Sequence, residues 1–313
     1  MPHAFHLTDQ GDVLLETIGR WLADPVREFT VSTPEAGPYA LTEGPDGALW
    51  FTLTHQGAIG RREADGRLTV HPLGDGTGPT VIAQGPDGAL WFSEYQAHRI
   101  GRITTDGKVS SFAPPTAEGG PFGIAAGPDG AMWFTLSGAD RLGRITTTGD
   151  ITEYPAPGAF PSAITAGPDG AMWFTLNQGN AIGRITMDGR TTAYPLPTEA
   201  AAPVGITAGP DGALWFVEIG AGQVGRITVD GTVTEHPLPD RASRPHAITT
   251  GPDGALWFTE WGRGRVGRIT VDGRITSHDL SAPTSEPHGI TPYGGALWCA
   301  LETGSLARIE VSG

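Results

Sequence analysis

The sequence predicts an all-β fold, a seven-bladed β-propeller, on two observations. First, a tryptophan-centred motif close to G-A-L-W-F occurs seven times in the 313 residues, at spacings of 41, 42, 40, 42, 42 and 41 residues. Second, each spacing holds several short strand patterns, and a repeat of this length with this content is typical of propeller blades. The seven tryptophans are Trp50, Trp91, Trp133, Trp173, Trp215, Trp257 and Trp298.

Each repeat divides into four strand-like pieces, as the fifth repeat illustrates. The first piece is the apolar run 203–207 (PVGIT). It is followed by the turn 209–212 (GPDG), in which proline presets φ and glycine takes a positive φ. The core strand is expected at 213–218 (ALWFVE) and an alternating strand at 224–230 (VGRITVD). A D-G turn then leads into the outer strand at 232–239 (TVTEHPLP).

The two ends of the repeat array complement each other. Residues 26–34 (VREFTVSTP) resemble the fourth piece of a repeat, whereas the last repeat stops after its third piece, 305–312 (SLARIEVS). We therefore expect an N-terminal strand to complete the last blade, which closes the ring and leaves no sheet edge open. The propeller is expected to span residues 26–313.

Residues 1–25 lie outside the repeat and form an N-terminal extension. Apolar residues at helical spacing predict a short helix packed on the outside of the propeller. These residues are Val13, Leu14, Ile18, Trp21 and Leu22.

The composition narrows the class of partner and the compartment. A net charge of −14, from 20 Lys plus Arg against 34 Asp plus Glu, opposes binding to nucleic acid or to an anionic membrane. Cys299 is the only cysteine, so no internal disulfide forms, and a reducing compartment suits the chain. The N-terminus does not resemble a secretory signal, and no run approaches the roughly 20 apolar residues of a membrane helix. We expect a soluble, cytoplasmic monomer.

Positions at which the seven copies disagree are candidates for a functional site. One such position follows the proline that opens the first strand of each repeat, and its side chain should lie at one mouth of the central channel. In repeat order its occupants are Tyr39, Thr80, Phe122, Ser162, Val204, His246 and His288. The two histidines fall in adjacent repeats, and Tyr39 follows them when the ring closes.

Two further positions carry a carboxylate in the seventh repeat alone. The residues before the same proline are Gly37, Gly78, Gly120, Phe160, Ala202, Arg244 and Glu286. Four residues after each core tryptophan stand Thr54, Tyr95, Ser137, Asn177, Ile219, Trp261 and Glu302. Because the second strand ends where the first begins, we expect Glu286, His288 and Glu302 to share one rim, beside His246.

Two carboxylates and two imidazoles at a channel mouth suit a hard divalent cation with a neighbouring base. Mg²⁺ prefers one or two carboxylates and completes its octahedron with water and substrate oxygens, and a histidine can abstract a proton near neutral pH. Singly, Glu302 could be an exposed polar residue and His246 a structural hydrogen bonder. The occurrence of all four residues together favours a functional site over these separate explanations.

Other polar residues are interpreted as structural or exposed. Glu94, Glu218 and Glu260, three residues after their tryptophans, recur in three repeats and are expected to be structural. The remaining histidines of the repeats are expected on the surface: His55, His71, His98, His236 and His278.

The repeat, with RPHAIT, WFTEW and EPHGI in its final third, closely resembles the virginiamycin B lyase family, also called streptogramin B lyases. The resemblance covers Val26 to Val311 and implies a seven-bladed propeller. The tyrosine of the family's G-P-Y-G-I-T matches Tyr39, and the histidine of its R-P-H-A-I-T matches His246. Its E-P-H-G-I matches Glu286 and His288, and the glutamate that ends its last core strand matches Glu302. The turn PYGGALWC, in place of GPDGALWF, is a departure far from these residues.

This resemblance implies a Mg²⁺-dependent carbon–oxygen lyase that confers antibiotic resistance. Such an enzyme linearises type B streptogramins, which are cyclic hexadepsipeptides, by elimination at the ester between threonine and phenylglycine. Glu286 and Glu302 would be the metal ligands and His288 the general base. His246 would position the substrate or assist charge development, and Tyr39 and Trp261 would contact the substrate. A metal-dependent lactone or ester hydrolase and a non-catalytic binding propeller are the alternatives.

Overall fold

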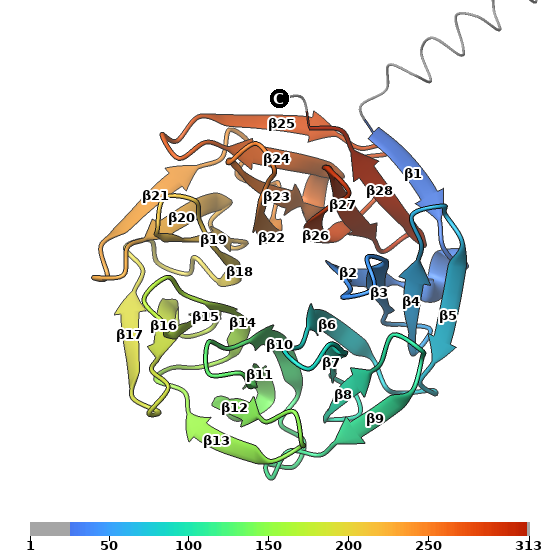
Figure 1. Cartoon of the computed structure of the whole chain (residues 1–313). Coiled ribbons are helices and arrows are strands. Elements are labelled where there is room, and N and C mark those ends of the chain that lie inside the picture. Colours follow the sequence, from blue (N-terminus) through green and yellow to red (C-terminus); the bar gives the residue numbers. More distant parts are fainter. Residues whose placement is uncertain (1–25, 312–313) are drawn as a thin grey trace, which may run out of the picture.

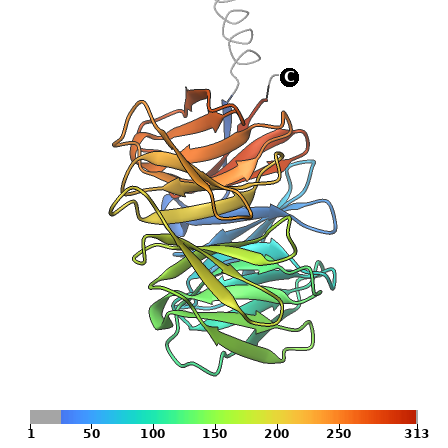
Figure 2. The ribbon, with the colours of Figure 1, turned by 90° about the vertical axis from the view of Figure 1, so that its left-hand side faces the viewer.

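Seven four-stranded antiparallel sheets stand around a central channel, as the face view shows (Figure 1). The computed structural model describes residues 26–311, and the helix expected within residues 1–25 lies outside the described residues. Seen from the side, strands of successive blades lie one over another along the ring (Figure 2). The predicted seven-bladed β-propeller is confirmed.

In blades 1 to 6 the strands follow one another from the channel outward in chain order. Blade 1 comprises β2 (Pro38–Glu43), β3 (Leu49–Leu53), β4 (Ala58–Arg62) and β5 (Leu68–Pro72), and blade 2 comprises β6 (Pro79–Gln84), β7 (Leu90–Glu94), β8 (Arg99–Ile103) and β9 (Val109–Phe112). Blade 3 comprises β10 (Pro121–Ala126), β11 (Met132–Leu136), β12 (Arg141–Ile145) and β13 (Ile151–Pro155), and blade 4 comprises β14 (Pro161–Ala166), β15 (Met172–Leu176), β16 (Ala181–Ile185) and β17 (Thr191–Pro195). Blade 5 comprises β18 (Pro203–Ala208), β19 (Leu214–Glu218), β20 (Gln223–Ile227) and β21 (Val233–Pro237), and blade 6 comprises β22 (Pro245–Thr250), β23 (Leu256–Glu260), β24 (Arg265–Ile269) and β25 (Ile275–Asp279).

Blade 7 joins the two ends of the described chain. It comprises β26 (Pro287–Tyr293), β27 (Ala296–Leu301), β28 (Ser305–Ile309) and, as its outer strand, β1 (Val26–Thr30). β1 pairs antiparallel with β28, with Val26 opposite Ile309. The closure expected from the sequence is therefore the one observed. The described residues also form three short 3₁₀ turns: η1 (Pro34–Ala36), η2 (Ser137–Ala139) and η3 (Trp261–Arg263).

Each core tryptophan is fixed by its own turn. In blade 6, Trp257 Nε1 donates to Asp253 Oδ1 at 3.0 Å, and Arg268 Nε donates to Asp253 Oδ2 at 2.7 Å. The guanidinium of Arg268 lies 5.8 Å from the centre of the tryptophan ring. The same Asp–Trp hydrogen bond occurs in blades 1 to 6. This bond explains why the GPDG turn recurs with the tryptophan four residues after its aspartate.

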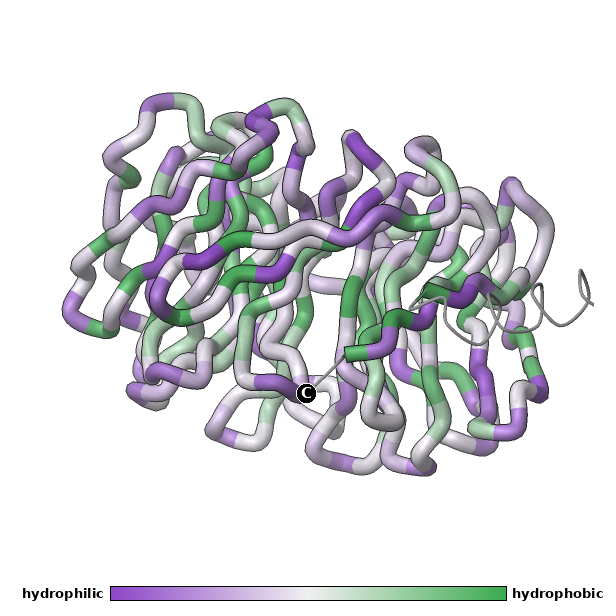
Figure 3. Tube along the Cα trace, turned by 90° about the horizontal axis from the view of Figure 1, so that it is seen from above, coloured by the Kyte–Doolittle hydropathy of each residue, from purple (hydrophilic) through white to green (hydrophobic). Residues whose placement is uncertain are grey.

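Hydrophobic residues concentrate along the strands, while many of the turns are hydrophilic (Figure 3). The tryptophans and phenylalanines of the second strands are buried between blades. Three histidines expected on the surface stack on these tryptophans from the outer strands: His71 on Trp50, His236 on Trp215 and His278 on Trp257. His278 is exposed, as expected, whereas His71 and His236 are half-buried. Aromatic residues fill the same place in other blades, so the three imidazoles are also packing groups.

The three recurrent glutamates are buried, as a structural role requires. In blades 2 and 6, Glu94 accepts from Arg99 and Glu260 from Arg265, each at 3.0 Å. Blade 5 differs because Gln223 stands where those blades have arginine, and it donates to Glu218 at 2.7 Å.

Within residues 26–311, no helix is long and apolar enough to cross a membrane.

Candidate functional site

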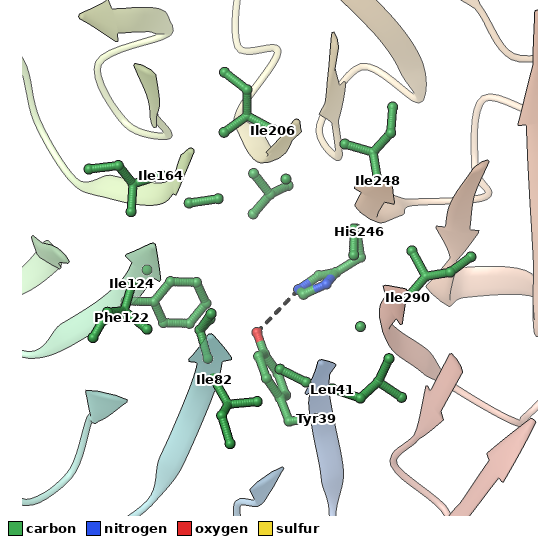
Figure 4. A pocket seen from close by; sticks show the side chains of 18 residues that line it. Tyr39, Leu41, Ile82, Phe122, Ile124, Ile164, Ile206, His246, Ile248 and Ile290 are labelled. Atoms are coloured by element: carbon green, nitrogen blue, oxygen red, sulfur yellow. Dashed lines mark hydrogen bonds between the residues drawn. The ribbon is translucent and has the colours of Figure 1, made fainter. Parts of the chain in front are cut away.

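The three rings expected at the channel mouth lie in contact. Tyr39 and His288 have ring centres 4.5 Å apart, and His246 and His288 are 4.8 Å apart in an edge-to-face arrangement. The hydroxyl of Tyr39 lies 3.4 Å from His246 Nε2, the dashed contact in Figure 4. Residues from blades 1, 6 and 7 therefore form one cluster, as the comparison of the repeats predicts.

An irregularity in the inner strands accompanies this cluster. In every blade the register between the first two strands shifts between the opening proline and the isoleucine or leucine three residues later. His246, for example, falls between Pro245 and Ile248 in the shifted stretch. A bulge re-aims side chains at a strand end, so the residue after the proline departs from the regular alternation.

Below the rings lies an apolar cavity of about 190 Å³ inside the channel. Its wall repeats one residue of each first strand (Figure 4). These residues are Leu41, Ile82, Ile124, Ile164, Ile206, Ile248 and Ile290. The polar rings therefore border an apolar interior, which excludes water from one side of the cluster.

Both carboxylates of blade 7 lie at this rim. Glu302 Oε2 lies 2.7 Å from His288 Nε2, and the amide of Glu302 donates to the carbonyl of Glu286 at 3.2 Å. His288 is itself held in place, since Thr259 Oγ1 donates to its carbonyl at 2.8 Å. The structure thus brings Glu286, His288 and Glu302 together beside His246.

His55 joins the cluster, although it was expected on the surface away from it. Its Nε2 lies 3.5 Å from Glu302 Oε1, across the seam between blades 1 and 7. Sequence reasoning missed it because its neighbour in space is separated by nearly the whole chain. The one usable signal was that ring closure makes blade 1 the neighbour of blade 7.

Glu286 occupies a left-handed backbone position. The residue before the opening proline has a positive φ in all seven blades, and it is glycine in blades 1 to 3. Glu286 has φ 47° and Arg244 has φ 50°. A non-glycine residue at such a position costs on the order of 1 kcal/mol, and Phe160 and Ala202 occupy it in blades 4 and 5. The three glycines of this series were the sequence signal for this strain.

The two histidines are neutral near pH 7. Burial, followed by the charge of the neighbouring His288, lowers the pKa of His246 to about 3. Burial also lowers the pKa of His288, although Glu302 and Glu286 act in the opposite direction. The pKa of Tyr39 is raised above its ordinary value by burial and by the charge of Glu302. The cluster therefore holds unprotonated imidazoles next to carboxylates.

Three polar atoms at the site are buried and lack a partner within residues 26–311: His246 Nδ1, His288 Nδ1 and Trp261 Nε1. Buried polar groups in native proteins are almost always hydrogen-bonded, so unpaired ones at a rim are candidates for pairing with a ligand. Trp261 belongs to this group, and its ring centre is 6.3 Å from that of His288.

A second hollow, of about 420 Å³, flanks the rim between blades 6 and 7. Arg244, Trp261 and Glu286 line it. The guanidinium of Arg244 lies 5.6 Å from the ring centre of Trp261. Trp261, expected to contact a substrate, therefore faces a space that also reaches Glu286.

The donor set suits a magnesium ion held by few protein ligands. Within the described residues, no lysine or arginine forms an ion pair with Glu286 or Glu302. Nor do three or more His, Cys, Asp or Glu side chains of that part of the chain gather into a cage for a metal. Mg²⁺ binds through one or two carboxylates and keeps several waters, so two carboxylates without a lysine or arginine partner match its preference.

Comparison with known proteins gives concordant matches. The model of the virginiamycin B lyase family matches residues 24–309. A virginiamycin B lyase of Streptomyces coelicolor is 75% identical over 139 residues, which cover 44% of this chain and 46% of that protein. The match to this curated relative thus spans about half of its length.

Two solved structures are similar over most of the chain. Selenomethionine-substituted virginiamycin B lyase of Staphylococcus aureus is 41% identical with a TM-score of 0.89, covering 92% of this chain and 99% of that one. A catalytically inactive histidine-to-alanine variant of the same protein, solved with quinupristin, has the same identity, coverage and TM-score.

Proposed function

Because the chain belongs to the virginiamycin B lyase family, we propose that it inactivates type B streptogramins by eliminative ring opening. The bond broken is the Cβ–O bond of the threonine whose hydroxyl is esterified by phenylglycine, so the enzyme is a carbon–oxygen lyase. The observation that carries this proposal is the contact of His288 Nε2 with Glu302 Oε2 at 2.7 Å, beside a second carboxylate and above an apolar cavity. A base with an adjacent carboxylate is the machinery that proton abstraction requires.

His288 is the general base that takes the threonine Cα proton. Its lowered pKa keeps the imidazole neutral near pH 7. A carboxylate only accepts hydrogen bonds, so Nε2 carries the hydrogen in the observed arrangement and the lone pair lies on the buried Nδ1. Nδ1 is then the atom that accepts the proton, and it has no hydrogen-bond partner within residues 26–311. Glu302 then stabilises the imidazolium that forms, as a carboxylate does beside a catalytic histidine.

His246 and Tyr39 orient the reacting ester. Their mutual contact of 3.4 Å holds both at the rim, and the low pKa of His246 leaves it a neutral hydrogen-bonding group. Trp261, with its unpaired Nε1 and its face toward the second hollow, contacts an apolar part of the macrocycle. Binding of this kind fixes the Cα–H bond relative to the base.

Glu286 and Glu302 are the proposed ligands of Mg²⁺. A bound Mg²⁺ supplies Lewis-acid polarisation of the carbonyl next to the Cα, which makes a weakly acidic C–H bond easier to ionise. The two carboxylates provide the negative charge that retains the ion, and their rim position leaves room for water and substrate oxygens. We expect the enzyme to act as a cytoplasmic monomer.

One incubation separates the proposed reaction from its alternatives. The protein is mixed with quinupristin, with and without EDTA, and the product is analysed by mass spectrometry. Elimination leaves the mass unchanged and gives the fragmentation pattern of an open chain, with activity lost in EDTA and restored by Mg²⁺. A product heavier by one water would mean ester hydrolysis and refute the lyase. Binding without a product would favour a non-catalytic propeller.

A further inference from the structure

In blades 1, 3 and 4, the side chain four residues after the core tryptophan donates a hydrogen bond to the following blade. Thr54 Oγ1 donates to the carbonyl of Pro79 at 2.6 Å, and Ser137 Oγ donates to that of Pro161 at 2.6 Å. Asn177 Nδ2 donates to the carbonyl of the next blade's proline at 3.2 Å. Glu302 occupies this position in blade 7, and the blade that follows is blade 1. A carboxylate cannot donate to a carbonyl, so Glu302 cannot make this contact and can only accept a hydrogen bond from a donor of blade 1.

His55 of blade 1 stands where that donor is needed. It follows β3, and its Nε2 lies 3.5 Å from Glu302 Oε1, while Glu302 Oε2 contacts His288 at 2.7 Å. The two oxygens of one carboxylate therefore face two imidazoles from different blades. A hydrogen on Nε2 is present both in one neutral tautomer of His55 and in its imidazolium, so the contact does not require protonation.

The surroundings fix the His55 ring although 51% of its side chain is exposed. Its amide donates to the carbonyl of Ala36 at 3.2 Å, and its ring packs over Gly37. A Cβ added at Gly37 would come within 2.6 Å of His55 Nδ1, so only glycine allows this approach. Glycine also suits the left-handed φ of 63° there.

We propose that His55 is a positioning residue that holds the carboxylate of Glu302 across the seam between blades 1 and 7. This proposal rests on the proposed function, in which Glu302 holds Mg²⁺ and assists His288. Carboxylates that bind metals are themselves held by hydrogen bonds, and loss of such a partner typically weakens metal binding by about 10- to 100-fold. Blade 1 thereby contributes to a metal site whose ligands both belong to blade 7.

The matched control is Gln96, which occupies the same place in blade 2. It packs over Gly78 as His55 packs over Gly37, since a Cβ at Gly78 would meet Gln96 Cγ at 2.7 Å. Gln96 has no carboxylate at the corresponding position, because the residue four after the preceding core tryptophan is Thr54. If the role of His55 were purely structural, His55→Ala and Gln96→Ala would therefore have the same effect on Mn²⁺ binding and on kcat.

The experiment compares His55→Ala, His55→Gln and Gln96→Ala with the wild type. Binding of Mn²⁺ is followed by water-proton relaxation, and kcat and KM for quinupristin are measured at limiting and saturating Mg²⁺. We expect His55→Ala to weaken Mn²⁺ binding about tenfold and to lower kcat mainly at limiting Mg²⁺, with KM unchanged. His55→Gln, whose amide donates at a similar reach, should recover most of both losses, and Gln96→Ala should change neither.

Failure of this proposal is separable from failure of the proposed function. Equal Mn²⁺ affinity and equal kcat in His55→Ala and Gln96→Ala, in an active enzyme, would overturn the role of His55 alone. An inactive wild type refutes the lyase, while the Mn²⁺ measurement still decides whether His55 holds Glu302. A wild type that neither binds Mn²⁺ nor turns over quinupristin overturns both.

Discussion

At the scale of single residues, His288 is the group on which the proposed chemistry depends most. We expect His288→Ala to lower kcat by about 10²- to 10⁴-fold, the usual contribution of a general base, without loss of folded protein. Steady-state turnover of quinupristin and a thermal melt measure the two effects. The matched control is His71→Phe, since Phe112 makes in blade 2 the stacking contact that His71 makes in blade 1. Similar turnover in both variants would reject His288 as the base.

Glu286 offers a test in which stability and activity move in opposite directions. Glu286→Gly removes a side chain from a left-handed φ of 47°, so we expect a gain on the order of 1 kcal/mol in the free energy of unfolding. It also removes one proposed Mg²⁺ ligand, so activity should fall at least tenfold. Urea denaturation and turnover at several Mg²⁺ concentrations measure these changes.

The control for Glu286→Gly is Ala202→Gly, at the same position of blade 5, where φ is 50°. This variant should be stabilised to a similar extent and keep its activity. If Glu286→Gly were as active as wild type, Glu286 would not be a metal ligand.

The sequence predicts the site residues well where one repeat can be compared with another. Tyr39, His246, His288 and Glu302 stand out because six other copies show what each position needs for folding alone. This comparison does not identify His55. Its contact with Glu302 depends on which blades become neighbours and on how far the side chain extends across the seam. The backbone strain at Glu286 was indicated by the comparison, because glycine fills the same position in blades 1 to 3, although the φ of 47° itself comes only from the structure.

At the scale of the element, blade 5 contains a carboxyl group without the cation that its counterparts have. Glu218 is fully buried, and Gln223 replaces the arginine found beside Glu94 and Glu260. Glu218 Oε1 is buried without a partner within residues 26–311, and Glu235 adds a second negative charge nearby. Burial, followed by the charge of Glu235, raises the pKa of Glu218 to about 7.

This raised pKa makes the stability of the protein depend on pH. A group whose pKa is higher in the folded state contributes stability that is fully present below its unfolded pKa of 4.5 and is lost as pH rises to about 7. Glu218→Gln cannot ionise and should escape this loss. We expect the two proteins to differ little at pH 4.5. As the pH rises, the free energy of unfolding of the variant should exceed that of the wild type by up to about 1.4 kcal/mol more per pH unit. This difference should level off above pH 7.

Urea denaturation of wild type and Glu218→Gln from pH 4.5 to pH 9 measures this dependence. Glu260→Gln is the comparison, because that carboxylate has an arginine partner and its loss should destabilise the protein at neutral pH. If the free energies of unfolding of wild type and Glu218→Gln changed in parallel with pH, Glu218 would be ionised over the whole range.

At the scale of the whole molecule, the ring closes through a strand that is distant in sequence from the rest of its blade. Periodicity alone predicts this closure, because an array that begins with a fourth strand and ends without one has a single complementary arrangement. Part of the packing at the junction follows the repeat, because Phe29 stands where the outer strands of other blades have an aromatic residue, whereas the contact of Arg62 does not. Phe29 of β1 stacks on Trp298 at 5.4 Å, and the guanidinium of Arg62 lies 4.8 Å from the centre of the tryptophan ring. The turn of blade 7 lacks the aspartate that binds the tryptophan in blades 1 to 6, and there Arg62 from blade 1 packs against Trp298.

Removal of β1 should therefore destabilise the ring as a whole. A chain that begins at Val31 lacks the partner of β28, whose free backbone edge then invites intermolecular pairing, and Trp298 loses the ring that covers it. We expect this chain to form soluble aggregates on size exclusion and to lose its cooperative thermal transition. A chain that begins at Asp24 keeps β1 and is the reference for this comparison. A synthetic peptide of residues 24–33 should restore the transition to the shortened chain, because it supplies the missing strand in trans. A shortened chain that stays monomeric and melts as wild type would show that six complete blades and three strands close the ring without it.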